Sequence, residues 1–236
     1  TGRALSGAIR SSHGRCRTVI DSLANHSTPA LERPHFIVRN MGLSDYQATW
    51  QAMKDFTHTR TAQTCDEIWL LQHPAVFTQG IAGKPEHLLH SHGIELIKTD
   101  RGGQITYHGP GQIIAYLLLD IRHLKLGVRE LVRNMENAVI DLLQDYRIKA
   151  VGRIEAPGVY VGNAKIAALG LKIKKNFCYH GIALNVDMDL TPFSYINPCG
   201  YQGLQVTQTK DLGITDELEV LSNRLAEKLQ EKLIKG

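Results

Sequence analysis

The segment at residues 112–120 (QIIAYLLLD) constrains the fold most, because seven consecutive apolar residues stand between its two polar ends. An unbroken apolar run of this length is typical of a strand that is buried on both faces of its sheet. We therefore predict a central strand here, with other elements packed against both of its faces.

Helical spacing of apolar residues predicts three helices. The clearest begins near Val128, with charged residues on one face and apolar residues at positions 131, 132, 135, 138, 139, 142 and 143. A first helix is predicted at residues 44–58, because Ser44-Asp45-Tyr46-Gln47 has the form of a capping box. Thr215-Asp216-Glu217 is predicted to open a C-terminal helix, whose apolar stripe consists of Leu218, Leu221, Leu225, Leu229 and Leu233.

Short runs of branched and aromatic residues, bounded by proline or glycine, predict strands at residues 66–72, 75–79 and 94–98. Residues 158–161 and the run from Ala164 onward are joined by Gly162-Asn163, which predicts a hairpin with Lys165 just past its turn.

A further strand is predicted by the alternating apolar residues Ile182, Leu184 and Val186. Strands and helices do not alternate regularly, and the hairpin-like returns favour antiparallel pairing. We therefore predict an α+β fold, with a mixed, largely antiparallel sheet and packed helices.

The composition indicates one soluble domain in a reducing compartment. The 236 residues are 43% hydrophobic, enough for one sizeable core, and a net charge of +4 is too small to argue for nucleic-acid binding. Four cysteines, at positions 16, 65, 178 and 199, form no C-x-x-C pair, so neither a disulfide framework nor a zinc site is expected. No apolar run reaches the roughly 18 residues of a membrane-spanning helix, so no membrane segment is expected.

Residues 1–35 differ from the rest, because serines are frequent and the first acid, Asp21, follows arginines at positions 3, 10, 15 and 17. This composition is typical of a mitochondrial transit peptide. The alternative, which we favour, is a disordered N-terminal extension of a cytoplasmic protein. Globular patterning starts near Phe36, and we expect residues 36–236 to form a single domain.

The densest glycine segment lies at residues 101–112 (RGGQITYHGPGQ) and is predicted to be a loop between two apolar strands. Glycines let a ligand lie against bare backbone, and the polar side chains of this loop can orient a carbonyl group. The segment matches neither the dinucleotide-binding nor the phosphate-loop glycine pattern. A plain turn is the alternative, but four glycines in ten residues favour a binding loop.

Asn197-Pro198-Cys199-Gly200 places a cysteine in a Pro/Gly loop, where its thiol can face a cleft. A reactive cysteine acts as the thiolate, and with a reference pKa of about 8.5 it needs a nearby cation. Lys165 is a candidate for that cation, although a lysine beside a turn is usually solvated. For Cys65 and Cys178 we favour burial as small apolar residues.

Seven segments in a fixed order carry a family resemblance: HPAVFTQG at 73–80, DRGGQITYHGPGQ at 100–112, LGVREL at 126–131, APGVYVG at 156–162 followed by Lys165-Ile166, LGLKI at 169–173, YHGIALNV at 179–186 and INPCGYQG at 196–203. Together they resemble the lipoyl(octanoyl) transferases from about residue 36 to residue 203, with no departure at a motif position. The fold of that family resembles the catalytic domain of biotin and lipoate ligases, which agrees with the α+β prediction.

The resemblance implies an acyltransferase catalytic domain that moves an octanoyl or lipoyl group from acyl carrier protein to a lysine of a lipoyl domain, the first step of endogenous protein lipoylation. The acceptors would be the lipoyl domains of 2-oxoacid dehydrogenase complexes and the glycine cleavage H protein. Cys199 would form an acyl thioester, and Lys165 would be its proton partner. No cofactor, ATP or metal is implied, and we expect a monomer.

The resemblance also assigns substrate-binding stretches. These comprise Arg101, Gly102, Gly103, Gln104, Ile105, Thr106, Tyr107 and His108, then Ala168, Leu169 and Gly170, and finally Gly181, Ile182 and Ala183. His73 and His180 are implied as supporting residues. The apolar residues Leu169, Ile182 and Leu184 are expected to line the acyl channel.

Two alternatives stay open. An ATP-dependent lipoate or biotin ligase of the same fold would adenylate a free acid and would not need Cys199. A non-catalytic protein would bind acyl carrier or lipoyl domains through basic residues such as Lys172, Lys174 and Lys175. His87, His90 and His92 lack an accompanying cysteine or acid pattern, so we favour solvated loop residues over a metal site.

Overall fold

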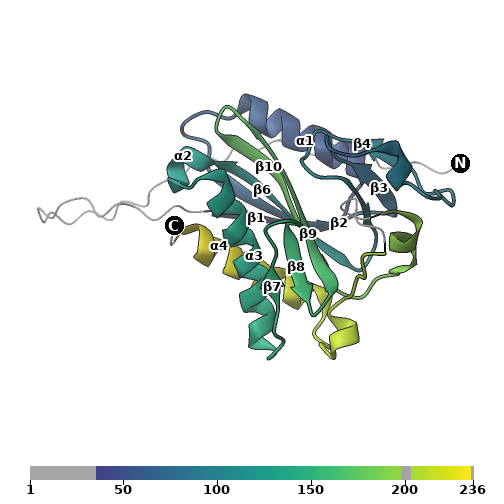
Figure 1. The fold of residues 1–236 in the computed structure, drawn as a ribbon. Coiled ribbons are helices and arrows are strands. Elements are labelled where there is room, and N and C mark those ends of the chain that lie inside the picture. The colour runs from purple at the N-terminus through teal and green to yellow at the C-terminus, as the bar shows by residue number, and fades with distance from the viewer. Residues whose placement is uncertain (1–35, 198–202, 235–236) are drawn as a thin grey trace, which may run out of the picture.

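The structure is a computed structural model, and it describes residues 36–197 and 203–234 (Figure 1). Its larger sheet has seven strands in the order β1-β2-β6-β10-β9-β8-β7. Only β1 and β2 are parallel, and every other neighbouring pair in this sheet is antiparallel. The strands are β1 (Phe36–Leu43), β2 (Asp66–Gln72), β6 (Gln112–Asp120), β7 (Val151–Gly152), β8 (Gly158–Val161), β9 (Ala164–Lys174) and β10 (Phe177–Asn185).

A smaller sheet has the order β4-β3-β5, with β3 parallel to β4 and antiparallel to β5. Its strands are β3 (Val76–Gln79), β4 (Leu96–Lys98) and β5 (Ile105–His108). Aromatic side chains of Phe77, Tyr107 and Phe193 pack in a core of their own beside this sheet.

Helices cover both faces of the larger sheet. Figure 1 shows α3 and α4 crossing one face, while α1 lies on the other face, near the smaller sheet. The helices are α1 (Tyr46–Thr59), α2 (Ile121–Leu124), α3 (Val128–Asp145) and α4 (Leu218–Ile234), with short 3-10 turns at Pro85–His87, Thr191–Tyr195 and Lys210–Leu212. Within the described residues, no helix has the length and apolar character needed to cross a membrane.

The prediction for the central strand is confirmed, because all nine residues of β6 are buried. Alternate side chains enter different cores: Leu117 and Leu119 meet α3 and α4, whereas Tyr116 and Leu118 lie on the α1 side. Six of the seven apolar positions predicted for the stripe of α3 are buried, and the seventh, Val132, is half-buried. The α+β prediction with a mixed, largely antiparallel sheet is therefore confirmed.

Two predicted helix starts were wrong in detail. The cap of α1 is Asp45, whose carboxylate accepts the Ala48 N–H at 2.8 Å, while the Ser44 hydroxyl turns back to the Met41 carbonyl. A carboxylate at this position satisfies a helix N–H that would otherwise lack a partner. The C-terminal helix begins at Leu218, three residues after Thr215.

The glycine segment is not a loop throughout, because Ile105–His108 forms β5. Its backbone pairs with β3, so hydrogen bonds from a distant strand turn part of the predicted loop into a strand. Strand β1 also went unpredicted, since it is an edge strand whose residues are mostly half-buried or exposed.

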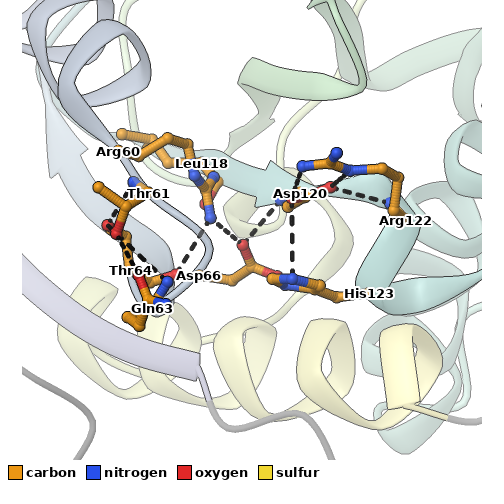
Figure 2. Close-up of polar contacts among 9 residues, drawn as sticks. All are labelled: Arg60, Thr61, Gln63, Thr64, Asp66, Leu118, Asp120, Arg122 and His123. Atoms are coloured by element: carbon orange, nitrogen blue, oxygen red, sulfur yellow. Dashed lines mark hydrogen bonds and ion pairs between the residues drawn. The ribbon is translucent and has the colours of Figure 1, made fainter.

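A buried ion-pair cluster lies where β2 begins and β6 ends (Figure 2). The Arg60 guanidinium donates to the Asp66 carboxylate at 2.6 Å, and the two side chains are 0% and 4% exposed. Asp66 also accepts the backbone N–H of Asp120 at 2.7 Å. Arg122 pairs with Asp120 at 2.6 Å, and His123 lies beside both carboxylates. This cluster fastens the turn before β2 to the end of β6.

Candidate active site

A cavity lies between the glycine segment and the middle of the larger sheet. The empty space in it is about 540 Å³, counting the open space at its mouth. The lining comes from the start of α1, the glycine segment, β5, β6, β9 and β10: Tyr46, Arg101, Gly103, Gln104, Ile105, Thr106, His108, Ile114, Tyr116, Ala168, Leu169, Gly170, His180, Gly181, Ile182 and Ala183. Segments far apart in sequence thus share one wall.

Glycines make this close packing possible. A Cβ on Gly181 would lie 1.9 Å from the Ala115 carbonyl oxygen of the neighbouring strand, so no side chain fits there. Gly170 pairs with Gly181 across β9 and β10, and the loop crosses β9 beside it, where the Gly102 N–H donates to the Leu171 carbonyl at 2.8 Å. The bare strand faces therefore let the glycine segment lie directly on the sheet.

Arg101 brings a buried positive charge to the cavity, since it is 7% exposed. Its guanidinium donates to the Thr78 carbonyl at 2.5 Å and to the Thr78 hydroxyl at 2.8 Å. A third bond goes to the Gly102 carbonyl at 2.9 Å. These bonds hold the charge in one orientation against the cavity.

Two buried histidines support the polar side of the cavity. His73 accepts the Tyr116 hydroxyl at Nε2 (2.8 Å), because its Nδ1–H donates to the Ser44 carbonyl at 2.7 Å. His108 contacts the Gln112 side-chain oxygen through Nδ1 at 2.8 Å. Burial lowers the pKa of His73 to about 4 and that of His108 to about 3, so both rings are neutral at pH 7. Neither ring is therefore an imidazolium that could act as a general acid in the cavity at pH 7.

A third histidine, His180, is 1% exposed and forms part of the cavity wall. Its Nε2 lies 3.0 Å from the Asp100 carboxylate, which also accepts the Trp50 ring N–H at 2.9 Å and the Tyr179 hydroxyl. The backbone of His180 has φ +63°, a left-handed conformation that costs a residue other than glycine roughly 1–3 kcal/mol. The surrounding strands hold His180 in this strained conformation.

Lys165 lies where the β8–β9 hairpin predicted it, but it is not solvated. It is 4% exposed, its Nζ donates to the Pro157 carbonyl at 3.2 Å, and it lies 5.2 Å from the Tyr160 ring centre. Glu136 is close by: burial raises the pKa of this carboxyl group, and the charge of Lys165 opposes that rise. Lys165 is not itself in the cavity wall, but Ala168, three residues along β9, is.

The backbone of Lys165 is clasped by the chain that follows residue 202. Its N–H donates to the Gln205 carbonyl at 2.8 Å, and its carbonyl accepts the Thr207 N–H at 3.0 Å. On the other side, the Asn197 N–H donates to the His87 carbonyl at 2.8 Å. Cys199 itself lies outside the described residues, as do Cys16 and the extension at residues 1–35.

Comparison with known proteins identifies the family. Residues 45–230 match the family model of the lipoyl protein ligase A/B catalytic domain. An octanoyltransferase of Nitrosospira multiformis is 70% identical over 196 residues, which cover 83% of this chain and 91% of the relative. One from Nitrosomonas eutropha is 66% identical over 190 residues, covering 80% and 84%. The chain belongs to the lipoyl protein ligase A/B family. The resemblance to the octanoyltransferases is therefore confirmed.

The fold of the lipoyl protein ligase A/B family extends to distant relatives. The bipartite lipoate protein ligase of Thermoplasma acidophilum superposes with a TM-score of 0.66 at 17% identity, covering 84% of each chain. At this identity the likeness concerns the fold alone. It confirms the predicted ligase-like architecture.

The structure brings most of the binding residues suggested by the family resemblance into one cavity wall. The exceptions are Gly102 and Tyr107, whose ring packs against Phe77 and Phe193 instead. The expectation that Leu184 lines the acyl channel is wrong: this side chain is fully buried in the core beneath α3 and α4 and does not belong to the cavity wall.

The sequence analysis did not predict several residues that line or support the cavity. Tyr46 of α1 and Tyr116 of β6 line the cavity, and the Asp100 carboxylate contacts Nε2 of His180. Tyr116 gave a signal, since it is the one polar-tipped side chain in the apolar run of β6. Cys178 is buried as predicted and burial raises its thiol pKa, whereas Cys65 is only half-buried. No group of three or more metal-binding side chains occurs within residues 36–197 and 203–234.

Proposed function

We propose that this chain transfers an octanoyl group from acyl carrier protein to a lysine of a lipoyl domain, through an acyl thioester on Cys199. The chain is an acyltransferase, since its curated relatives are octanoyltransferases. The observation that carries the proposal is the placement of Lys165. A lysine buried beside a cavity and clasped by residues 205–207 is held next to the chain that leads out of the NPCG motif.

In the first half of the proposed reaction, the Cys199 thiolate attacks the carbonyl carbon of the carrier thioester. The bond from that carbon to the carrier sulfur breaks, and the departing thiolate takes a proton from the Lys165 ammonium. This leaves an acyl-enzyme thioester and a neutral Lys165. Backbone N–H groups of the glycine segment are suited to stabilise the negative oxygen of the tetrahedral intermediate.

In the second half, the neutral amine of the acceptor lysine attacks the same carbon. A carbon–nitrogen bond forms, the bond to Cys199 breaks and its electron pair returns to the sulfur. The nitrogen's surplus proton passes to Lys165, which regains its charge. The cycle needs no external oxidant, metal or nucleotide.

The partners follow from this reaction. We propose octanoyl-acyl carrier protein as donor, and as acceptors the lipoyl domains of 2-oxoacid dehydrogenase complexes and the glycine cleavage H protein. The working unit is proposed to be a monomeric domain at residues 36–236, acting in the cytoplasm. An octanoyl chain suits a cavity whose wall includes Ile114, Leu169 and Ile182.

The proposal is tested by acyl trapping. The protein is incubated with octanoyl-acyl carrier protein without ATP, and its intact mass is measured before and after hydroxylamine. We expect a hydroxylamine-labile octanoyl adduct that Cys199→Ser and Cys199→Ala do not form. The matched control, Cys65→Ser, keeps the adduct because Cys65 lies outside the cavity wall. Formation of the adduct by Cys199→Ala would overturn the mechanism.

A further inference from the structure

Nδ1 of His180 is a buried polar atom without a hydrogen-bond partner within residues 36–197 and 203–234. One more such atom in the same residues belongs to the cavity wall, the side-chain oxygen of Gln104. A buried polar group that lacks a partner is costly to fold, and it is usually satisfied by water or a ligand. Two of them around one cavity point to polar atoms in its occupant.

The contacts of His180 determine what its Nδ1 can do. The Asp100 carboxylate accepts from the Trp50 ring, which can only donate, and from the Tyr179 hydroxyl. Burial raises the pKa of Asp100, but the hydrogen bonds from His180 and Tyr179 outweigh it and hold the pKa below its ordinary value. An ionised carboxylate only accepts, so the Nε2 of His180 carries the hydrogen.

The remaining nitrogen is then an acceptor. Burial lowers the pKa of His180, and Asp100 opposes that shift only in part, so the ring is neutral at pH 7. A neutral ring that donates from Nε2 has a lone pair at Nδ1. This lone pair can accept an N–H or O–H but cannot bind a carbonyl oxygen.

This acceptor discriminates between the two halves of the proposed reaction, on which the inference rests. In the first half the reacting thioester offers only acceptor atoms. In the second half the attacking lysine nitrogen brings N–H donors to the same carbon. Arg101 adds a positive charge to the cavity wall, which favours the neutral amine over the ammonium.

We propose that Nδ1 of His180 accepts a hydrogen bond from the amine of the acceptor lysine and directs the amine's lone pair at the thioester carbon. His180 is thus a catalytic residue of the second half-reaction only. Asp100 is a positioning residue, since it fixes the tautomer through Nε2 at 3.0 Å. The proton itself still passes to Lys165.

The test measures the two half-reactions separately. His180→Gln is the main variant, because the glutamine amide can donate to Asp100 from about the Nε2 position but places no acceptor at the Nδ1 position. Single-turnover mixing with octanoyl-acyl carrier protein gives the acylation rate, and mixing the isolated acyl-enzyme with a lipoyl domain gives the transfer rate. We expect acylation within about twofold of wild type and transfer slowed roughly 10²-fold, the typical effect of misoriented reactants.

A second variant separates chemistry from folding. His180→Gly leaves room for a free imidazole and also suits positive φ. Added imidazole should restore transfer to the lipoyl domain in His180→Gly, after subtraction of the acyl-enzyme decay measured without acceptor. The matched control, His58→Gln, changes an exposed histidine of α1 and should leave both rates unchanged.

The outcomes distinguish the two proposals. A wild-type protein that forms no acyl-enzyme would overturn the proposed function, and this inference with it. Acylation with wild-type transfer in His180→Gln would overturn this inference alone. Equal slowing of both half-reactions would also overturn it, because His180 would then serve the donor arm or the cavity's shape.

Discussion

Removal of Arg60 by an Arg60→Met substitution should show how strongly the buried cluster of Figure 2 depends on charge balance. Methionine keeps the apolar stem in contact with the rings of Phe56 and Phe177, over which the guanidinium lies. It removes the bond of 2.6 Å to Asp66, whose side chain is 4% exposed. Asp66 would then retain one backbone donor, the Asp120 N–H.

The magnitude depends on pH. Breaking a buried ion pair by removing one partner typically costs about 3–5 kcal/mol. Burial already raises the pKa of Asp66, and Arg60 opposes that rise, so losing Arg60 raises the pKa further. A carboxyl group with a raised folded pKa binds more protons when folded, so stability falls as pH rises from the unfolded pKa to the folded one. Without Arg60, the folded protein can protonate Asp66 instead of burying an unpaired charge. The cost of protonating Asp66 is ~1.4 kcal/mol for each pH unit above its unfolded pKa of ~3.9, so the loss of stability from the unpaired charge cannot exceed ~1.5 kcal/mol at pH 5.

Urea unfolding at pH 7 and pH 5 measures this directly, by linear extrapolation of the free energy of unfolding. We expect Arg60→Met to lose about 3–5 kcal/mol at pH 7 and about 2 kcal/mol less than that at pH 5. Adding Asp66→Asn should recover most of the loss and remove its pH dependence. Lys210→Met breaks an exposed pair with Asp187 and should cost at most ~1 kcal/mol. An equal loss for Arg60→Met at both pH values would refute the reasoning.

Three further outcomes are expected. Lys165→Arg keeps the positive charge but cannot give up a proton near pH 7, so alkylation of Cys199 should stay fast while the transfer rate falls by roughly 10²–10⁴-fold. Wild-type rates of alkylation and transfer in Lys165→Met would show that Lys165 has only a structural role. Gly181→Ala places a Cβ 1.9 Å from the Ala115 carbonyl oxygen and should lower the free energy of unfolding in urea by at least about 1–3 kcal/mol. The control Gly127→Ala, with open space around its Cβ, should cost a few tenths of a kcal/mol. Equal losses for the two variants would contradict the steric argument. Removal of residues 1–35, which lack periodic apolar residues, should leave the melting temperature and transfer rate nearly unchanged; a large drop in melting temperature would contradict this expectation.

Periodicity was enough to predict the elements whose burial is set by their own side chains. The apolar run of β6 predicted a strand covered on both faces, and the stripe of α3 predicted a helix packed on a sheet. Both patterns are local, because side-chain direction follows from backbone geometry within a few residues. Motif order added the family, and with it the candidate residues that converge on the cavity.

Tertiary contacts decided the remainder. Strand β5 exists because β3 supplies its hydrogen bonds, so a glycine-rich run that is loop-like by composition became a strand. The Asp100–His180 contact joins residues eighty positions apart, and no spacing rule links them. Lys165 is buried although lysines beside turns are usually solvated, because residues 205–207 return to its strand. The sequence alone determined which functional groups are candidates for the chemistry, but the tautomer of His180 and the burial of Lys165 depend on neighbours that only folding brings into contact.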